Sequence, residues 1–114
     1  GLYYINNALE LTIQDVNGND ERASYSFNPT IGQKYILGAT KNGNTIHLFI
    51  DGVIVSCYTL SAGFQFFNGS APLRLGNGTY TKNLNFVGRQ NTAIIWKGRG
   101  MSASEIADIT NNYF

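Results

Sequence analysis

Five turn dipeptides of the Asn-Gly or Asp-Gly type divide this sequence of 114 residues into short segments. Such dipeptides favour the tight turns of β-hairpins, because Asn, Asp and Gly adopt positive φ at little cost. Several of the segments between them alternate apolar and polar side chains, which is typical of strands with one face toward a core. The pattern therefore predicts antiparallel β-structure.

The first block of the chain predicts a hairpin. Residues 9–14 alternate between apolar and polar side chains, residues 22–27 do the same, and Asn17-Gly18 lies between the two segments. The next block predicts a three-stranded meander, because its segments are joined directly by turn dipeptides. Its expected strands are residues 34–41, 45–50 and 53–60, with Asn42-Gly43 and Asp51-Gly52 as the turns.

The pattern is looser after residue 60. A short strand is expected at residues 72–75, a polar loop from residue 77 to 85, and a largely buried final strand at residues 92–97. Trp96 lies in that last segment, so we expect it in the core. Cys57 is the only cysteine and falls within an apolar run, so we expect a buried, unreactive thiol.

One helix is expected at the C-terminus. Ser102 and Glu105 have the spacing of a capping box, in which each side chain accepts a backbone N–H of the other residue. Met101 and Ile106 have the spacing of a hydrophobic staple around the same cap. A helix of about ten residues is marginal alone, so it must dock on the rest of the fold.

Together these elements predict one all-β domain, an antiparallel β-sandwich with one short C-terminal α-helix. The eight Lys and Arg are scattered and the formal net charge is +1, which argues against a nucleic-acid partner. No apolar stretch approaches the roughly 20 residues that a membrane-spanning helix needs.

The middle and end of the chain resemble the laminin G-like branch of the concanavalin A-like jelly-roll superfamily. The resemblance lies in the hairpin sequence from Ile46 to Val55, in Pro72-Leu73-Arg74-Leu75-Gly76, and in the stretch from Phe86 to Ile106 that ends in the helix start. It covers roughly residues 33 to 113 and implies a jelly-roll sandwich.

Members of this family commonly have further strands before the position where this chain begins. The resemblance therefore implies that residues 1–114 are a single laminin G-like domain from a longer protein, with the N-terminal strands lying upstream or supplied by a neighbouring chain. It also implies an extracellular or virion-surface location.

A catalytic site is not expected. Glycoside hydrolases use a closely spaced pair of carboxylates, but Glu10 is the one acid on a well-defined expected strand, and its same-face neighbours are Thr12 and Gln14. Asp51 is explained by a turn and Glu105 by a cap. His47 is the single histidine, and no nucleophile motif accompanies it.

Calcium is the one cofactor that remains a candidate, because related lectin and laminin G-like domains often bind it. Asp15, Asn17 and Asp20 carry suitable oxygens in the first hairpin loop, although the spacing of a dedicated calcium loop is missing. Turn chemistry explains the same residues, and we prefer it.

Carbohydrate binding usually combines an exposed aromatic ring with amide and hydroxyl groups. One long connection gathers such residues, and the alternative for them is turn geometry and packing of the tyrosine: Asn68, Asn77, Thr79, Tyr80, Lys82 and Asn83. We expect a non-catalytic binding module, carbohydrate-binding or adhesive, whose partner is a glycan or a surface protein. The alternative is a structural module of a phage or viral particle, in a tail, fibre or decoration, that contacts neighbouring copies.

Overall fold

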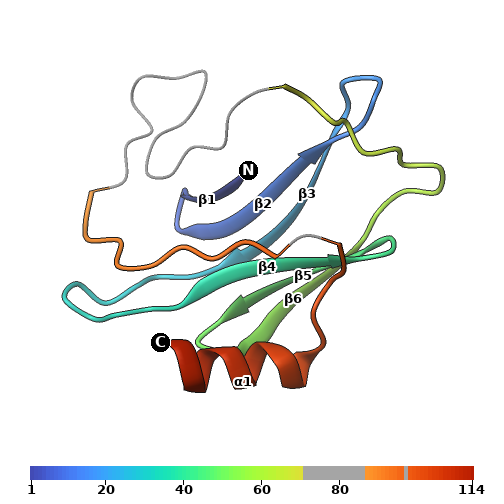
Figure 1. Ribbon diagram of the computed structural model, residues 1–114. Coiled ribbons are helices and arrows are strands. Elements are labelled where there is room, and N and C mark those ends of the chain that lie inside the picture. Colours follow the sequence, from blue (N-terminus) through green and yellow to red (C-terminus); the bar gives the residue numbers. More distant parts are fainter. Residues whose placement is uncertain (71–86, 97) are drawn as a thin grey trace. The chain divides into compact units, whose positions relative to one another are not determined.

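The computed structural model describes residues 1–70, 87–96 and 98–114 (Figure 1). The chain divides into two compact units, one formed by residues 1–67 with 98–114 and the other by residues 68–97. All strands and the helix of the described residues belong to the first unit. No helix in these ranges is long and apolar enough to cross a membrane.

The first sheet is an antiparallel meander of three strands in the order β1-β2-β3. Its strands are β1 (Leu2–Ile5), β2 (Ala8–Gln14) and β3 (Asp20–Ser26), which confirms the hairpin expected from residues 9–14 and 22–27. Strand β1 was not expected from the sequence. It joins β2 through Asn6 and Asn7, whose φ angles of 51° and 58° are those of a type I′ turn.

The second sheet is also a meander, and it confirms the three-stranded block expected from the sequence. Its strands are β4 (Leu37–Asn42), β5 (Thr45–Ile50) and β6 (Val53–Thr59). Asp51 and Gly52 form the second turn, with φ angles of 50° and 82°. In the first turn the two loop residues are Gly43 and Asn44, because Asn42 still pairs with Thr45.

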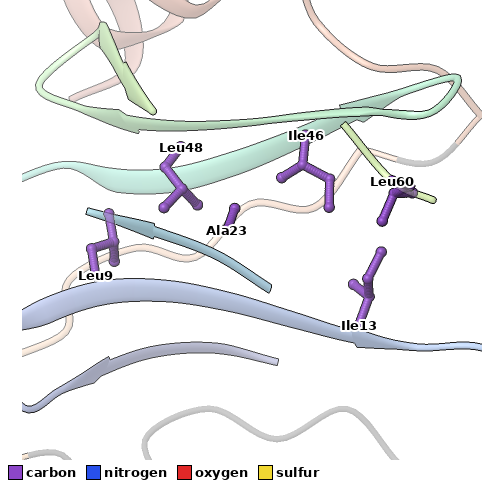
Figure 2. Packing of buried hydrophobic residues seen from close by; sticks show 6 residues of the cluster. All are labelled: Leu9, Ile13, Ala23, Ile46, Leu48 and Leu60. Atoms are coloured by element: carbon purple, nitrogen blue, oxygen red, sulfur yellow. The ribbon is translucent and has the colours of Figure 1, made fainter. Parts of the chain in front are cut away.

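The hydrophobic core lies between the two sheets. Leu9, Ile13 and Ala23 of the first sheet point toward side chains of the second (Figure 2). The opposing side chains are Ile46 and Leu48 of the second sheet and Leu60, which directly follows β6. Burying both inner faces against each other is what holds a sandwich together. The predicted all-β sandwich is confirmed. Among the described strands, those that pair in a sheet also follow one another in the sequence.

One long side of the sandwich is closed by contacts between β3 and β6. The carboxylate of Glu21 accepts the hydroxyl of Tyr58 at 3.0 Å and the backbone N–H of Ser61 at 3.0 Å. The Ser61 and Tyr58 hydrogen bonds lower the pKa of Glu21, and the same carboxylate raises the pKa of Tyr58. Ser56 Oγ also donates to the carbonyl of Ser24 at 3.1 Å. Glu21 therefore links the sheets.

The C-terminal helix α1 (Ala103–Tyr113) begins at the predicted cap. Glu105 N–H donates to Ser102 Oγ, and Ser102 N–H donates to the Glu105 carboxylate, so both bonds of the capping box are present. The helix lies across the face of the second sheet that is turned away from the core (Figure 1). Ile106 is buried there, and Thr110 lies close to Gly52. The expected docking is confirmed.

The final strand expected at residues 92–97 is not present over its described part, residues 92–96. Trp96 is 47% exposed, so its expected place in the core is wrong. A strand needs backbone hydrogen-bond partners along its length, and no described strand pairs with this segment. The short strand expected at residues 72–75 lies outside the described residues.

Candidate functional site

The loop predicted to bind a ligand is described only at its start. Asn68 is exposed and lies in no helix or strand. The other predicted residues lie outside the described ranges: Asn77, Thr79, Tyr80, Lys82 and Asn83. The loop stays a prediction from sequence.

The calcium candidates form a turn that is held by its own carboxylate. Asp15 Oδ1 accepts the N–H groups of Asn17 and Asn19, each at 2.8 Å, and Asp15 Oδ2 accepts the Asn19 side-chain amide at 3.1 Å. The hydrogen bonds from Asn19, with those from Asn17, lower the pKa of Asp15. Asp20 accepts the amide of Gln14 at 3.3 Å. The Asp15 and Asp20 carboxylates thus take part in turn chemistry, as the sequence favoured, and calcium stays an untested candidate.

The acidic side chains of the described residues do not gather at one point. Within the described ranges no three side chains of the His, Cys, Asp or Glu type come together as a metal site. Glu10 faces Arg22 at 3.9 Å on the outer surface of the first sheet. Asp51 Oδ1 accepts the N–H of Ile36 at 2.8 Å, and Glu105 caps the helix. Each of these carboxylates therefore contacts a structural partner.

Cys57 is exposed, so the expectation of a buried thiol is wrong. The reason is the register of β5 and β6. Ile46 pairs with Tyr58 and points into the core, so the neighbouring pair, His47 and Cys57, lies on the opposite face of the sheet. The apolar run predicts a buried thiol, whereas this strand has one inner and one outer face.

A group of aromatic and amide side chains gathers at one end of the sandwich. We call it the aromatic end and define it by Tyr4, Asn7, Phe27, Thr30 and Tyr35. The rings of Tyr4 and Phe27 lie edge to face with centroids 6.1 Å apart, and those of Phe27 and Tyr35 do the same at 5.1 Å. Three aromatic rings from separate parts of the sequence therefore form one contiguous group.

Hydrogen bonds fix this group in place. The carbonyl of Asn7 accepts the N–H of Phe27 at 2.9 Å, which ties the β1–β2 turn to the end of β3. Tyr4 donates its hydroxyl to Asn7 Oδ1 at 3.4 Å. The hydroxyl oxygen of Tyr35 accepts the N–H of Thr30 at 2.8 Å and so anchors the connection from β3 to β4.

Tyr4 is exposed although it lies on the core-facing side of its sheet. It pairs in register with Leu9, which in turn pairs with Tyr25, so all three side chains share one face. Leu9 is fully covered by the second sheet, but Tyr4 is 43% exposed at the edge strand. Tyr3 points to the other face of the same strand and is 39% exposed.

The segments that carry Tyr4, Asn7, Phe27 and Thr30 have no charged side chain. Residues 1–9 and 23–33 contain no Asp, Glu, Lys, Arg or His side chain. The nearest following cation, Lys34, donates its ammonium group to the carbonyl oxygen of Phe114 at 2.7 Å. These four residues therefore offer apolar and hydrogen-bonding groups that carry no charge.

Sequence reasoning missed this site because it missed β1. The signals were present in the apolar run Leu2–Ile5 and in Asn6-Asn7, a pair that supports a type I′ turn as Asn-Gly does. The contacts of Tyr4 with Phe27, and of Phe27 with Tyr35, depend on tertiary packing that no local pattern encodes.

Comparison with known proteins gives one informative similarity. The sequence matches no protein-family profile and no curated protein. The fold is similar to a crystal structure of residues 221–444 of an S-layer domain-containing protein from Clostridium thermocellum. The TM-score is 0.62 at 21% sequence identity over 90% of this chain, and the match covers 51% of the other chain. The chain thus has the fold of about half of that structure.

Proposed function

We propose that this chain is a non-catalytic carbohydrate-binding or adhesive module of an extracellular surface protein. The observation that carries the proposal is the aromatic end, where an exposed tyrosine ring lies beside amide and hydroxyl groups. Sugars offer an apolar ring face together with hydroxyl groups, and a site of this composition complements both.

Two further observations support the surface location. The protein with the similar fold is named as containing an S-layer domain, and the sequence resembles laminin G-like domains over roughly residues 33 to 113.

Binding of the purified chain to immobilised glycans tests the proposal, with affinities measured by calorimetry. Tyr4→Ala removes the exposed ring of the aromatic end, and we expect it to weaken binding about tenfold or more, as truncation of an aromatic anchor does. Tyr3→Ala is the matched control, since Tyr3 lies on the same strand, is similarly exposed and points to the opposite face. Absence of glycan binding at millimolar concentration would contradict the proposal.

A structural or assembly module is the second candidate, and the edge of the first sheet favours it. Among the described strands, β1 pairs with β2 alone. Gly1 and Thr12 exchange two backbone hydrogen bonds, so by alternation the N–H and C=O groups of Leu2 and Tyr4 point away from β2. An edge of this kind pairs readily with another strand. Sedimentation of the chain as a concentration-dependent oligomer, abolished by Tyr4→Pro, would favour this function.

A further inference from the structure

We propose that the aromatic end takes neutral glycans and discriminates against acidic ones. This inference rests on the proposed carbohydrate-binding function and names the class of ligand for the same site. It follows from three properties of the site: the free face of a ring, hydrogen-bonding groups that carry no charge, and the lack of charged side chains in residues 1–9 and 23–33.

The ring of Tyr4 has a face that its aromatic neighbour does not use. Tyr4 and Phe27 meet at an interplanar angle of 81°, so the edge of one ring meets the face of the other. Such a contact occupies at most one face of Tyr4. With 43% of the residue exposed, the ring presents apolar surface on which the C–H face of a sugar ring can stack.

Neutral hydrogen-bonding groups lie on the segments that carry this ring and its neighbour Phe27. The Asn7 side chain accepts the Tyr4 hydroxyl through Oδ1, which orients its amide nitrogen as a donor toward the other side. Asn6 lies in the same turn, and Asn28 follows Phe27 on the connection to β4. Amides and hydroxyls both donate and accept, and this suits sugar hydroxyl groups, which do the same.

Among the described residues, the segments that carry Tyr4 and Phe27 offer an acidic glycan no ionic partner. A carboxylate or sulfate is bound well only where Arg or Lys offers charge-assisted hydrogen bonds. The segments 1–9 and 23–33 supply neither, and the ammonium group of Lys34 already donates to Phe114. Bringing an anionic sugar onto an uncharged aromatic surface removes water from the anion without compensation.

A matched pair of ligands tests this selectivity on the whole chain. Lactose and sialyllactose share their neutral disaccharide and differ by one acidic sugar, and neutral hexasaccharides can be compared in the same way with oligogalacturonate and heparin hexasaccharide. We expect binding to the neutral member of each comparison, with the acidic member at least about tenfold weaker. Affinity for the neutral ligand should not change when NaCl is raised from about 0.05 M to about 0.5 M, because no ion pair is screened.

Two variants sharpen the result. Ile31→Lys adds one cation to the connection that follows Phe27, and it should improve affinity for the acidic ligands while leaving that for the neutral ligands within about twofold. Ile31→Ser removes an aliphatic side chain that is 101% exposed at the tip of the same connection. Such a side chain suits a protein interface better than a sugar, so its loss should not affect glycan binding.

Each contrary outcome has a distinct meaning. Equal or tighter binding of acidic glycans, or affinity that falls with salt, overturns the neutral selectivity and leaves the carbohydrate-binding function intact. Absence of binding to any glycan overturns both proposals. Loss of glycan binding in Ile31→Ser with no loss in Tyr4→Ala overturns the stacking site and moves the glycan contact to the connection that carries Ile31.

Discussion

The two sheets of the sandwich have the same topology and very different surroundings. The second sheet has other parts of the chain against both faces. Its inner face packs against the core, and part of its outer face is covered by α1 and the segment before α1. Met101 N–H, in that segment, donates to Thr40 Oγ1 of β4 at 2.8 Å. Within the described residues the first sheet packs against the core on one face only, and its strand β1 exposes both Tyr3 and Tyr4.

Because of this difference, we expect one sheet to contribute more to stability and the other more to binding. A sheet covered on both faces loses more stability from a substitution, because its side chains have neighbours on every side. An edge strand with exposed rings contributes less to the core and offers more to a ligand. We therefore expect the second sheet to act as the scaffold and the first sheet to carry the contact surface.

The largest expected effect is on the core side of the second sheet. Leu48 is 0% exposed, and Leu48→Ala should reduce the free energy of unfolding by about 3 kcal/mol through lost burial and the cavity left behind. Leu9→Ala is the matched substitution in the first sheet, where Leu9 is 1% exposed. It should cost less, about 2 kcal/mol, because the described residues cover only one face of that sheet. Urea unfolding measures both, and equal losses would remove the distinction between the sheets.

The next effect tests the helix that covers the outer face. Ile106→Ala should lower the free energy of unfolding by about 2 kcal/mol, because Ile106 is the one buried residue of α1. Asp108→Ala in the same helix alters an exposed position and should stay within about 0.5 kcal/mol of the unchanged chain. Urea unfolding measures both variants. If they lose the same free energy of unfolding, α1 does not stabilise the second sheet.

A smaller effect concerns pH. The ion pair with Arg99, at 2.6 Å, lowers the pKa of Glu105 to about 2, below its ordinary value near 4.5. Because the folded chain holds this carboxylate in its charged form, the stabilisation is fully present above pH 4.5 and is lost as the pH falls toward 2. Glu105→Gln keeps a capping side chain but removes the charge.

Thermal melting of the unchanged chain and Glu105→Gln at a series of pH values measures this contribution. The difference between their melting temperatures should shrink as the pH is lowered from 5 to about 2. Comparison with the variant is needed because Asp15 and Glu21 also have lowered pKa values and destabilise the chain in the same acidic range. A difference that is independent of pH would show that the Arg99 pair does not stabilise the helix.

The parts that could be predicted from sequence are those with a local cause. The Asp51-Gly52 turn, the alternation of Leu9 and Ile13, and the Ser102 cap each depend on residues a few positions apart, and all are confirmed. The predictions that failed depend on how distant segments pair and pack. Cys57 lies on an outer face because of its pairing with His47, and Trp96 lacks the strand partner that burial would require.

The candidate site shows the same division. The turn at Asp15 was assigned from sequence because its hydrogen bonds reach only two to four residues along the chain. The contact between Tyr4 and Phe27 spans two strands and two turns, so only the folded register brings the rings together. Where a function depends on such distant pairs, composition can suggest the residue types but not their positions.

The position of Cys57 also makes this chain convenient to handle in the laboratory. It is the only cysteine in the sequence and its thiol is exposed on the outer face of β6. A maleimide-linked dye or sensor surface can therefore be attached at one known point without any substitution. Tyr4 belongs to the other sheet, so chains anchored through β6 would all be immobilised in the same orientation with the aromatic end unmodified.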